Sequence, residues 1–288
     1  MTQDGPRNGE TNLMEITTKQ AKPFKNLFDS LKDIIEDAIL RWEKDGLYIK
    51  ASDHSNIIAS NTFLLASEFE HYYLSPKING KDDEPLEINV SVRHLNRAIQ
   101  AAGNSDIIHM IYNSQEPDYL SIVIKNEEKK ETHFSDIQIS EVTQDILGVE
   151  EHCTRDNYST ILKMPSGEFD SICKNLKRQN VEKVNIHFDG LRLSFMYKVN
   201  MNRGRIIRDS VDSNNSSEHL IQRVFHDSEI DDVFCTFSTV YIHNISKCAK
   251  IDSKAVVEIC LDKETPARFE FRVGTLGSTV FFLAPFIE

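Results

Sequence analysis

The 288-residue chain contains the same layout twice, about half its length apart. Each copy begins with an apolar helical stripe and continues through an Asp-Gly turn into an alternating strand. The turns are Asp45-Gly46 and Asp189-Gly190. The stripes are Phe24, Leu27, Phe28 and Leu31 in one copy, and Phe169, Ile172, Cys173 and Leu176 in the other. Such a tandem duplication builds a pseudo-symmetric body, which favours a scaffold or a ring.

The hydrophobic periodicity predicts an α+β fold in which each half is β-rich and carries two helices packed on sheets. A period of 3.6 residues predicts helices over about 22–33, 91–102, 166–178 and 238–250. Ser166, directly after Pro165, is the predicted N-cap of the third helix. Alternating β-branched and aromatic residues predict strands over 47–51, 107–112, 119–124, 184–188, 191–197, 255–261, 267–273 and 279–283.

Composition shifts divide the chain into a disordered tail (1–12), an N-terminal domain (13–142), a connecting loop (143–158) and a C-terminal domain (159–288). The tail is polar and has no apolar core segment of the kind a secretory signal contains. The connecting loop is polar around the short apolar island Ile146–Val149. The Asn-, Ser- and Asp-rich segment 200–219 is expected to include a mobile loop.

The composition also excludes several classes of function. Five widely spaced cysteines with no Cys-x-x-Cys pair indicate a reducing compartment and make a zinc site improbable. The chain has no Gly-x-x-x-x-Gly-Lys-Ser/Thr loop, so ATP hydrolysis is not expected. We therefore expect no catalytic residues, no metal and no cofactor, and the protein is not expected to be an enzyme.

Positive charge is concentrated on the four predicted helices, although the chain as a whole has a net charge of −12. These helices contain only four acidic side chains. On a helical wheel, Arg93 and Arg97 lie opposite the apolar stripe of their helix, which is the arrangement of a solvent-facing cationic surface. Four such helices in an acidic protein favour sequence-independent contact with DNA phosphates. The candidate DNA-binding residues are Lys22, Lys25, Lys32, Arg93, Arg97, Lys174, Lys177, Arg178, Lys247 and Lys250.

Several stretches resemble signatures of the proliferating cell nuclear antigen family, the DNA sliding clamps of eukaryotes and archaea. They are Ser30–Ile35, Ala102–Ile108, Lys163–Phe169 and Leu283–Glu288, and the resemblance extends from about Leu13 to Glu288. It implies a polymerase processivity factor, a homotrimeric ring whose helices line a hole through which duplex DNA passes. It also implies loading by an ATP-dependent clamp loader and docking of DNA polymerase and other replication and repair proteins.

The resemblance further implies a pocket for short partner peptides that carry a glutamine, an aliphatic residue and two aromatics. By position, this pocket consists of Ile57, Leu147, Gly148, Val149, Pro266, Phe282, Leu283, Ala284, Pro285 and Ile287. Subunit contact is implied between edge strands at about 131–139 and 204–209, where Phe134, Ile137, Ile206 and Ile207 are the apolar candidates.

Three alternatives remain open from the sequence. The chain could be a subunit of a heteromeric checkpoint-type clamp, or a monomeric processivity factor with the clamp fold that holds DNA by charge alone. A nucleic-acid-modifying enzyme is the alternative from a different class. The expected location is the nucleus, or a cytoplasmic replication factory if this divergent sequence is viral.

Overall fold

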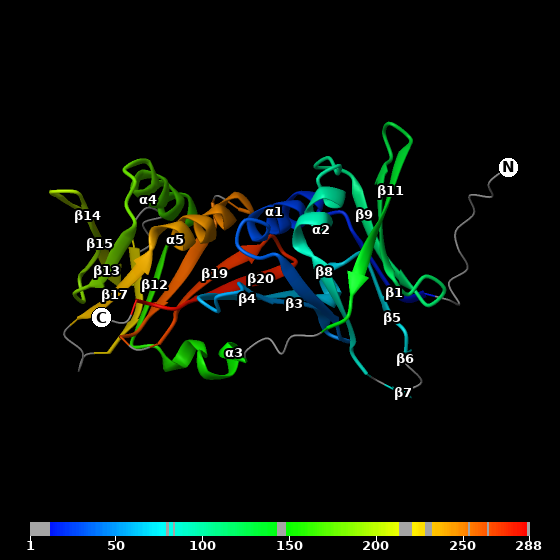
Figure 1. Ribbon diagram of the computed structural model, residues 1–288, viewed down its shortest axis with the longest axis horizontal. Helices are drawn as coiled ribbons and strands as arrows, with labels where there is room; N and C mark the ends of the chain where they lie inside the picture. Colours follow the sequence, from blue (N-terminus) through cyan, green and yellow to red (C-terminus); the bar gives the residue numbers. More distant parts are fainter. Residues whose placement is uncertain are drawn as a thin grey trace.

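The computed structural model describes residues 12–78, 81–82, 84–142, 148–212, 221–227, 232–252, 254–263 and 265–286. Figure 1 shows an elongated body in which four helices lie along one side of a strongly twisted set of sheets. These helices are α1 (Ala21–Leu31), α2 (Val92–Ile99), α4 (Ser166–Arg178) and α5 (Thr239–Ser246), the last continued by the short 3-10 helix η3 (Lys247–Lys250). All four predicted helices are therefore confirmed. No helix in the described part of the chain is long and apolar enough to span a membrane.

The N-terminal half pairs its strands in the order β5-β1-β9-β10-β11-β8-β2-β3-β4. Their bounds are β1 Asn12–Thr18, β2 Asp37–Trp42, β3 Gly46–Ser52, β4 Ile58–Leu65, β5 His71–Leu74, β8 Leu86–Ser91, β9 Ile107–Asn113, β10 Tyr119–Asn126 and β11 Glu131–Ser140. A 3-10 turn η1 (Ala66–Glu68) and the small ribbon β6 (Lys77–Ile78) and β7 (Lys81–Asp82) lie between β4 and β8.

The C-terminal half repeats the two blocks of strands β5-β1-β9-β10-β11 and β8-β2-β3-β4, but joins them through the parallel pair β16–β15, in the order β20-β19-β18-β12-β16-β15-β14-β13-β17. Its strands are β12 Thr160–Pro165, β13 Lys183–Phe188, β14 Arg192–Val199, β15 Asn202–Asp212, β16 Ile221–His226, β17 Val233–Ser238, β18 Val256–Leu261, β19 Ala267–Val273 and β20 Gly277–Leu283. The pairings β1–β9 and β12–β18 correspond, as do β3–β4 and β14–β15. The predicted duplication and the α+β class are thus confirmed.

Burial explains why each helix lies on its sheet. Phe24, Leu27 and Phe28 of α1 are fully buried, and in α4 the Phe169 ring stacks on Phe269 of β19 with 5.7 Å between centroids. Burying an aromatic or a branched aliphatic side chain contributes about 1.5–3 kcal/mol each. The apolar stripes read from the sequence are therefore the surfaces that hold the helices in place.

The two halves are joined by one continuous sheet, because β20 pairs with β4 along seven residues from Gly277↔Leu64 to Leu283↔Ile58. Across this seam the fully buried Thr62 and Thr279 hydroxyls are hydrogen bonded at 2.7 Å. A Cβ atom at Gly277 would lie 2.0 Å from the carbonyl oxygen of Phe63, so the close approach of the two strands requires glycine at this position.

Two local predictions were wrong, and two other segments contain structure that the sequence did not indicate, although residues 213–219 of the expected mobile loop lie outside the described residues. The helix begins at Ser166 itself, whose hydroxyl donates to the carbonyl of Asp252 at 2.9 Å and does not cap the helix. Asn12 belongs to β1 and not to a tail. Residues 202–212 form β15, because cross-strand pairing with β14 outweighs their polar composition. The connecting loop contains the short helix α3 (Val149–His152) and the 3-10 turn η2 (Arg155–Asn157).

We predict that Gly277→Ala lowers the free energy of unfolding by at least about 2 kcal/mol, because the added methyl group forces β20 away from β4. Ser278→Ala, at a partly exposed neighbouring position, is the matched control and should change it by less than about 0.5 kcal/mol. Denaturant unfolding followed by circular dichroism measures both. Equal stability of the two variants would contradict the assigned strand contact.

Candidate nucleic-acid interface and peptide-docking surface

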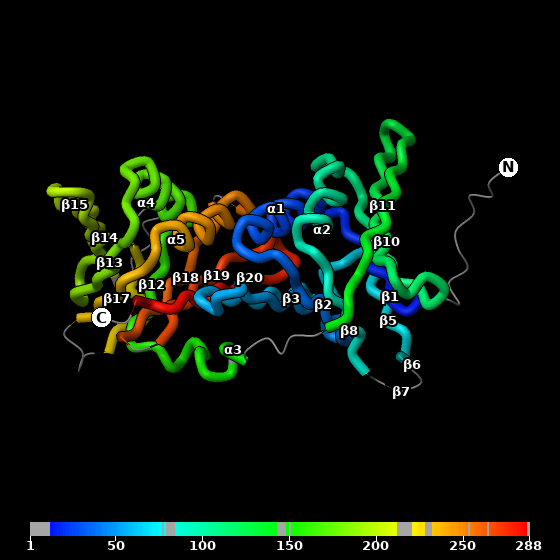
Figure 2. Tube along the Cα trace, viewed as in Figure 1, coloured from blue at the N-terminus to red at the C-terminus, as the bar shows by residue number. Residues whose placement is uncertain are grey.

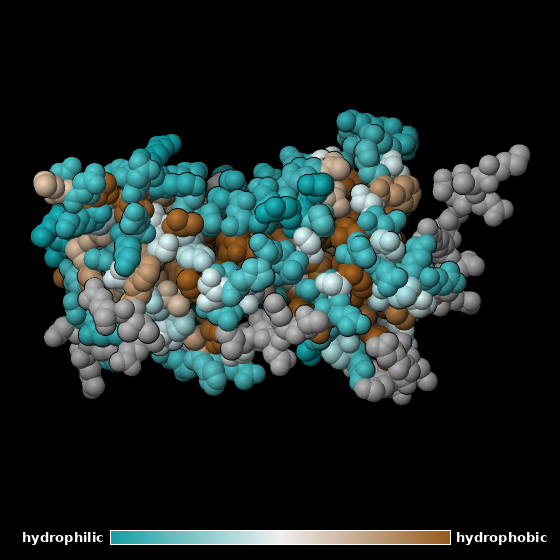
Figure 3. Space-filling model, in the orientation of Figure 1, coloured by the Kyte–Doolittle hydropathy of each residue, from teal (hydrophilic) through white to brown (hydrophobic). Residues whose placement is uncertain are grey.

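Nine of the ten candidate DNA-binding residues lie on α1, α2, α4 and η3, and Lys32 directly follows α1, on the side of the molecule where the helices gather. α1 packs beside α2 and η3, and α4 packs beside α5. Hydrophilic side chains cover much of this side in the space-filling view (Figure 3). The duplication therefore brings the cationic helices of both halves to one common surface.

Half of the ten cations have free charges. Lys22, Arg93, Arg97, Lys177 and Arg178 are exposed, and none of them is paired with an acidic side chain among the described residues. Arg93 and Arg97 line a hollow of about 370 Å³ together with Lys32, Asp33, Asn96 and Gln100. Exposed guanidinium and ammonium groups without an internal partner are suited to phosphate contact.

The other five cations are engaged within the protein. Lys25 donates to the backbone carbonyls of Gln100 and Ala102 at 3.1 and 3.0 Å, where it satisfies the C-terminal end of α2. Lys174 pairs with Asp170 one turn earlier at 2.5 Å. Lys32 and Lys250 pair with Asp29 of α1, and Lys247 pairs with Asp33 in the turn after it. The charge that the sequence assigns to the helices is thus only partly available to a ligand.

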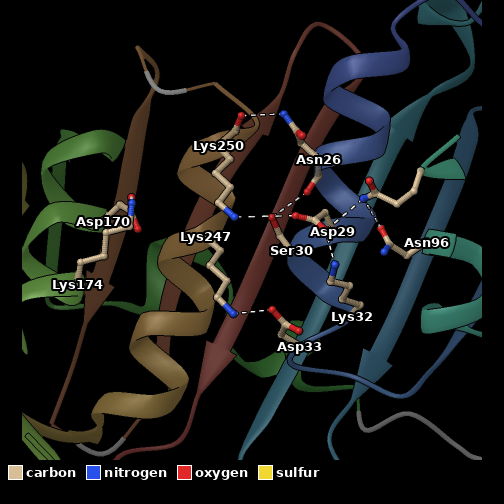
Figure 4. A network of polar contacts seen from close by, with 11 residues as sticks. Asn26, Asp29, Ser30, Lys32, Asp33, Asn96, Asp170, Lys174, Lys247 and Lys250 are labelled. Atoms are coloured by element: carbon tan, nitrogen blue, oxygen red, sulfur yellow. Dashed lines mark hydrogen bonds and ion pairs between the residues drawn. The ribbon is translucent and has the colours of Figure 1, made fainter. Parts of the chain in front are cut away.

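Asp29 of α1 and Asp33 of the turn after α1 pair with lysines of η3, and we call Asp29, Asp33, Lys247 and Lys250 the inter-domain latch (Figure 4). Lys247 contacts Asp33 at 2.5 Å, and Lys250 lies 3.9 Å from Asp29, which also binds Lys32. Asn26 supports the latch by donating to the carbonyl of Lys250 at 2.9 Å. Partial burial alone would raise the pKa of Asp33, but its hydrogen bond with Lys247 and the surrounding lysines lower it below the ordinary value. The latch joins the two halves on the helix side, opposite the seam of the sheet.

On the other side of the sheets the connecting loop covers a separate apolar cluster, with α3 below the strands in Figure 1. Cys153, Tyr158, Ile161, Cys260 and Phe282 are buried together, and Val149 of α3 packs against them. The Tyr158 hydroxyl donates to the carbonyl of Pro266 at 2.7 Å. This cluster fixes the second half of the loop, which the sequence suggested only as a linker.

An ionic cluster around Glu258 holds the same segment. Arg155 of η2 binds this carboxylate at 2.7 Å, and Lys163 and Arg268 lie 3.6 and 3.5 Å from it. Burial would raise the pKa of Glu258, but the hydrogen bond and charge of Arg155, with Lys163 and Arg268, lower it. The connecting loop is therefore held by both apolar packing and charge.

The predicted peptide pocket is assembled only in part. The Ile57 side chain is 38% exposed, and its carbonyl accepts a hydrogen bond from the amide of Ala284 at 2.9 Å, which brings the chain end beside the β3–β4 turn. Gly148 is exposed, while Val149, Pro266, Ala284 and Pro285 are half-buried. Leu147 and Ile287 lie outside the described residues.

Phe282 and Leu283 do not offer free side chains to a peptide. Phe282 is 5% exposed beneath the connecting loop, and Leu283 is fully buried in the main core. The two side chains point to opposite faces of β20, and both faces are covered, one by the connecting loop and the other by the main core. We correct their assignment from direct contact to support of the surface formed by Ile57 and the chain end.

Sequence reasoning missed the residue that shapes the Ile57 turn. One carboxylate oxygen of Asp53 accepts from the amides of Ile57 and Ile58 at 2.8 and 3.0 Å, and the other accepts from the Tyr241 hydroxyl at 2.8 Å. Asp53 thus connects the turn to α5 of the other half. The signal in the sequence was the Asp-His-Ser-Asn run, which favours an Asx-type turn.

The predicted subunit edges are open along much of their length. Within the described residues, positions 131–138 of β11 pair only with β10, and positions 202–209 of β15 pair only with β14. Phe134 is 70% exposed and Ile207 is 41% exposed, as an apolar contact between subunits requires. Ile137 is buried in the core and Ile206 packs against it, so these two stabilise the subunit itself.

Comparisons with known proteins agree with the geometry. The family model described as "Proliferating cell nuclear antigen, N-terminal domain" matches residues 13–147, and the corresponding C-terminal domain model matches residues 152–286. Three relatives named "Proliferating cell nuclear antigen" align with nearly the whole chain. The protein from Chaetomium thermophilum is 25% identical over 275 residues, 95% of this chain and 98% of the relative. Those from Dictyostelium discoideum and Saccharomyces cerevisiae are 26% and 23% identical, over 96% and 95% of this chain and 100% and 98% of their own lengths.

We predict that the free cations and the latch lysines differ in their effect on duplex binding. Replacing Arg93 and Arg97 by Gln should lower the slope of log affinity against log salt concentration by roughly two, one unit for each lost phosphate contact. The matched pair Lys247→Gln and Lys250→Gln should leave the slope nearly unchanged. Fluorescence anisotropy with a labelled duplex at several salt concentrations measures both. Equal losses in the two variants would show that the latch lysines contact DNA.

We also predict a pH-dependent role for Glu258. Because its pKa is lower in the folded than in the unfolded state, its contribution to stability is present at neutral pH and is lost as the pH falls through the folded-state pKa. Glu258→Gln should cost about 1–2 kcal/mol at pH 7. Thermal unfolding should show this difference shrinking below about pH 4.5, near the ordinary glutamate pKa. Glu128→Gln in an exposed turn is the control, and a pH-independent difference for Glu258→Gln would refute the assignment.

Proposed function

Because this chain belongs to the proliferating cell nuclear antigen family of DNA sliding clamps, we propose that three copies close into a ring around duplex DNA. The ring keeps a bound polymerase on its template, since a closed ring leaves the duplex only by opening or by reaching an end. The protein acts as a scaffold and not as an enzyme. Loading requires a separate ATP-driven clamp loader, because the sequence carries no phosphate-binding loop of its own.

The observation that supports the ring best is that the open edge strands, β11 and β15, are equivalent to β20 and β4, which pair with each other inside the subunit. β11 and β20 hold equivalent places, since each is the last strand of its half. β4 and β15 are also equivalent, since each pairs with the strand that follows an Asp-Gly turn, β3 or β14. Within one subunit β20 pairs with β4. Pairing of β11 with β15 of the next copy repeats the same contact between subunits, and three repetitions build a ring of six similar domains.

Contact with DNA follows from the free cations on the helices. Lys22, Arg93, Arg97, Lys177 and Arg178 touch phosphates without reading bases, so the ring slides along any sequence. Affinity for linear DNA is weak and sensitive to salt, because few charges are free and the contacts are exposed.

Replication and repair proteins dock on the opposite side through short peptides. The exposed Ile57 and Gly148 and the half-buried Val149, Pro266, Ala284 and Pro285 form the described part of this surface, with Leu147 and Ile287 assigned to it from the family resemblance. An aromatic side chain against Ile57 and backbone pairing with the extended chain end would provide the contacts.

A heteromeric ring and a monomeric processivity factor are the alternative assemblies. The three eukaryotic relatives support a nuclear location, and a cytoplasmic viral replication factory is the alternative location.

Retention on circular DNA tests the proposed function. Protein loaded by a purified clamp loader onto nicked circular plasmid should co-elute with the DNA at moderate salt and be released after the plasmid is cut once. Release at the same rate from intact circles and cut plasmid would contradict a ring that encircles DNA.

We predict that Phe134→Asp lowers the native mass to that of one subunit, since it places a charge in the apolar contact between β11 and the next copy. Val240→Asp alters a similarly exposed apolar residue on α5 and should preserve the wild-type mass. Light scattering coupled to size exclusion measures both variants. An unchanged mass for Phe134→Asp would remove β11 from the subunit contact.

A further inference from the structure

A hollow lies on the sheet surface of the C-terminal half, away from α4 and α5. Its volume is about 740 Å³, and it is bordered by β13, β14, β15 and β17 and by the chain end at Phe286. Figure 2 shows the C-terminal end of the chain lying against this set of strands. The hollow is separate from both the cationic helices and the Ile57 surface.

Three cations form a row across adjacent strands at this hollow. Lys198 of β14 is directly opposite Arg203 of β15. On its other side Tyr197 is opposite Val184, so Lys183 of β13 is next in the same row. Neighbouring strands lie about 4.8 Å apart, which brings the three charges within about 10 Å. Arg205 adds a fourth cation one position along the outward side of β15.

This row carries a cost in the isolated subunit, because like charges directly opposite each other destabilise a sheet. All four cations are exposed, and within the described residues none of them forms an ion pair with an acid. Arg205 instead donates to the Ser194 hydroxyl at 3.0 Å, and Glu182 is the one acidic side chain that lines the hollow. The row concentrates unpaired positive charge on the sheet side of a protein whose net charge is −12.

Closure of the proposed ring leaves most of this charge unpaired. The neighbouring subunit would bring β11 beside β15, and among the outward-facing positions 132, 134, 136, 138 and 140 of that strand Asp136 is the single acid. With Glu182 of the hollow and one carboxylate from the neighbouring subunit, the row keeps a net positive charge, which favours an anionic partner from outside the ring.

The remaining lining indicates a peptide as that partner. The ammonium group of Lys183 lies 4.1 Å from the centre of the Phe286 ring, and Met196 forms an apolar part of the floor. The Phe286 amide donates to the carbonyl of Thr236 at 2.8 Å, which fixes this aromatic wall at the edge of the row. A duplex is too wide to enter such a hollow, whereas an extended chain can place carboxylates on the row and apolar side chains on Met196 and Phe286.

We infer that the Lys183–Lys198–Arg203 row is a docking site for an acidic segment of a partner protein. This second docking site goes beyond the proposed function, although it lies on the same side of the ring as the proposed peptide-docking surface. Phe286 directly follows Ala284 and Pro285, which lie beside Ile57. One partner protein can therefore bind the Ile57 surface with its docking peptide and this row with an acidic segment next to that peptide. The site would favour partners with such an acidic segment over those with a basic one.

The test uses the full-length protein and a fluorescein-labelled ten-residue peptide of alternating glutamate and serine at low salt. Lys198→Glu combined with Arg203→Glu should weaken binding at least tenfold. Lys125→Glu combined with Lys129→Glu makes the same change of charge at exposed sites far from the hollow and should weaken binding less than twofold. A peptide of alternating lysine and serine should not bind, and the native mass of each variant is measured alongside.

Three results would overturn the inference. The first two are no binding of the acidic peptide and equal weakening of binding in both double variants. The third is that a ten-nucleotide single strand, added at the same concentration as the peptide, displaces the peptide from the Lys125/Lys129 control variant. The last result would assign the row to nucleic acid. The peptide assay does not use a ring loaded on DNA, so the two claims can fail separately. If the protein binds the acidic peptide but is not retained on circular DNA, the proposed function is refuted and this inference stands.

Discussion

The pairing of β20 with β4 is the contact on which the rest of the structure depends. It joins the two halves into one sheet, and the glycine at position 277 and the buried Thr62–Thr279 hydrogen bond define how closely the strands approach. On the opposite side, the Asp33–Lys247 contact joins the turn after α1 to η3. The junction is therefore held on both surfaces, and the subunit can act as a stiff arc. A ring closed by the same type of strand contact needs such a stiff unit, because flexible arcs would also form open or irregular assemblies.

Some helix cations hold the two halves of the subunit together, and others remain free to contact DNA. Asp29 and Asp33 bind three lysines of the helix side, which leaves the free cations mainly on α2 and α4 and at the start of α1. Exposed pairs of this kind add little stability, commonly 0–1 kcal/mol each, so their main consequence is to reduce the positive charge offered to DNA. A ring that holds DNA by topology does not need strong binding, and weaker phosphate contact permits movement along the duplex.

The sequence predicted local features well and long-range contacts poorly. The stripe from Phe169 to Leu176 predicted α4, and the repeated Asp-Gly turns predicted the duplication, because both signals are contained in neighbouring residues. The burial of Leu283 and the strand over 202–212 depend on partners that are far apart in the chain or on pairing that composition does not show. Pairing of Lys247 with Asp33 likewise joins residues 214 positions apart, so counting charges helix by helix overestimated the free cations.

Electron microscopy of the negatively stained wild-type protein, without DNA or loader, tests the central claim most directly. The account predicts closed particles with threefold symmetry and an open centre, whose size persists when the protein is diluted before staining. Elongated single subunits, or open chains of variable length, would contradict closure through β11 and β15 and would direct attention to partner subunits or to binding by charge alone.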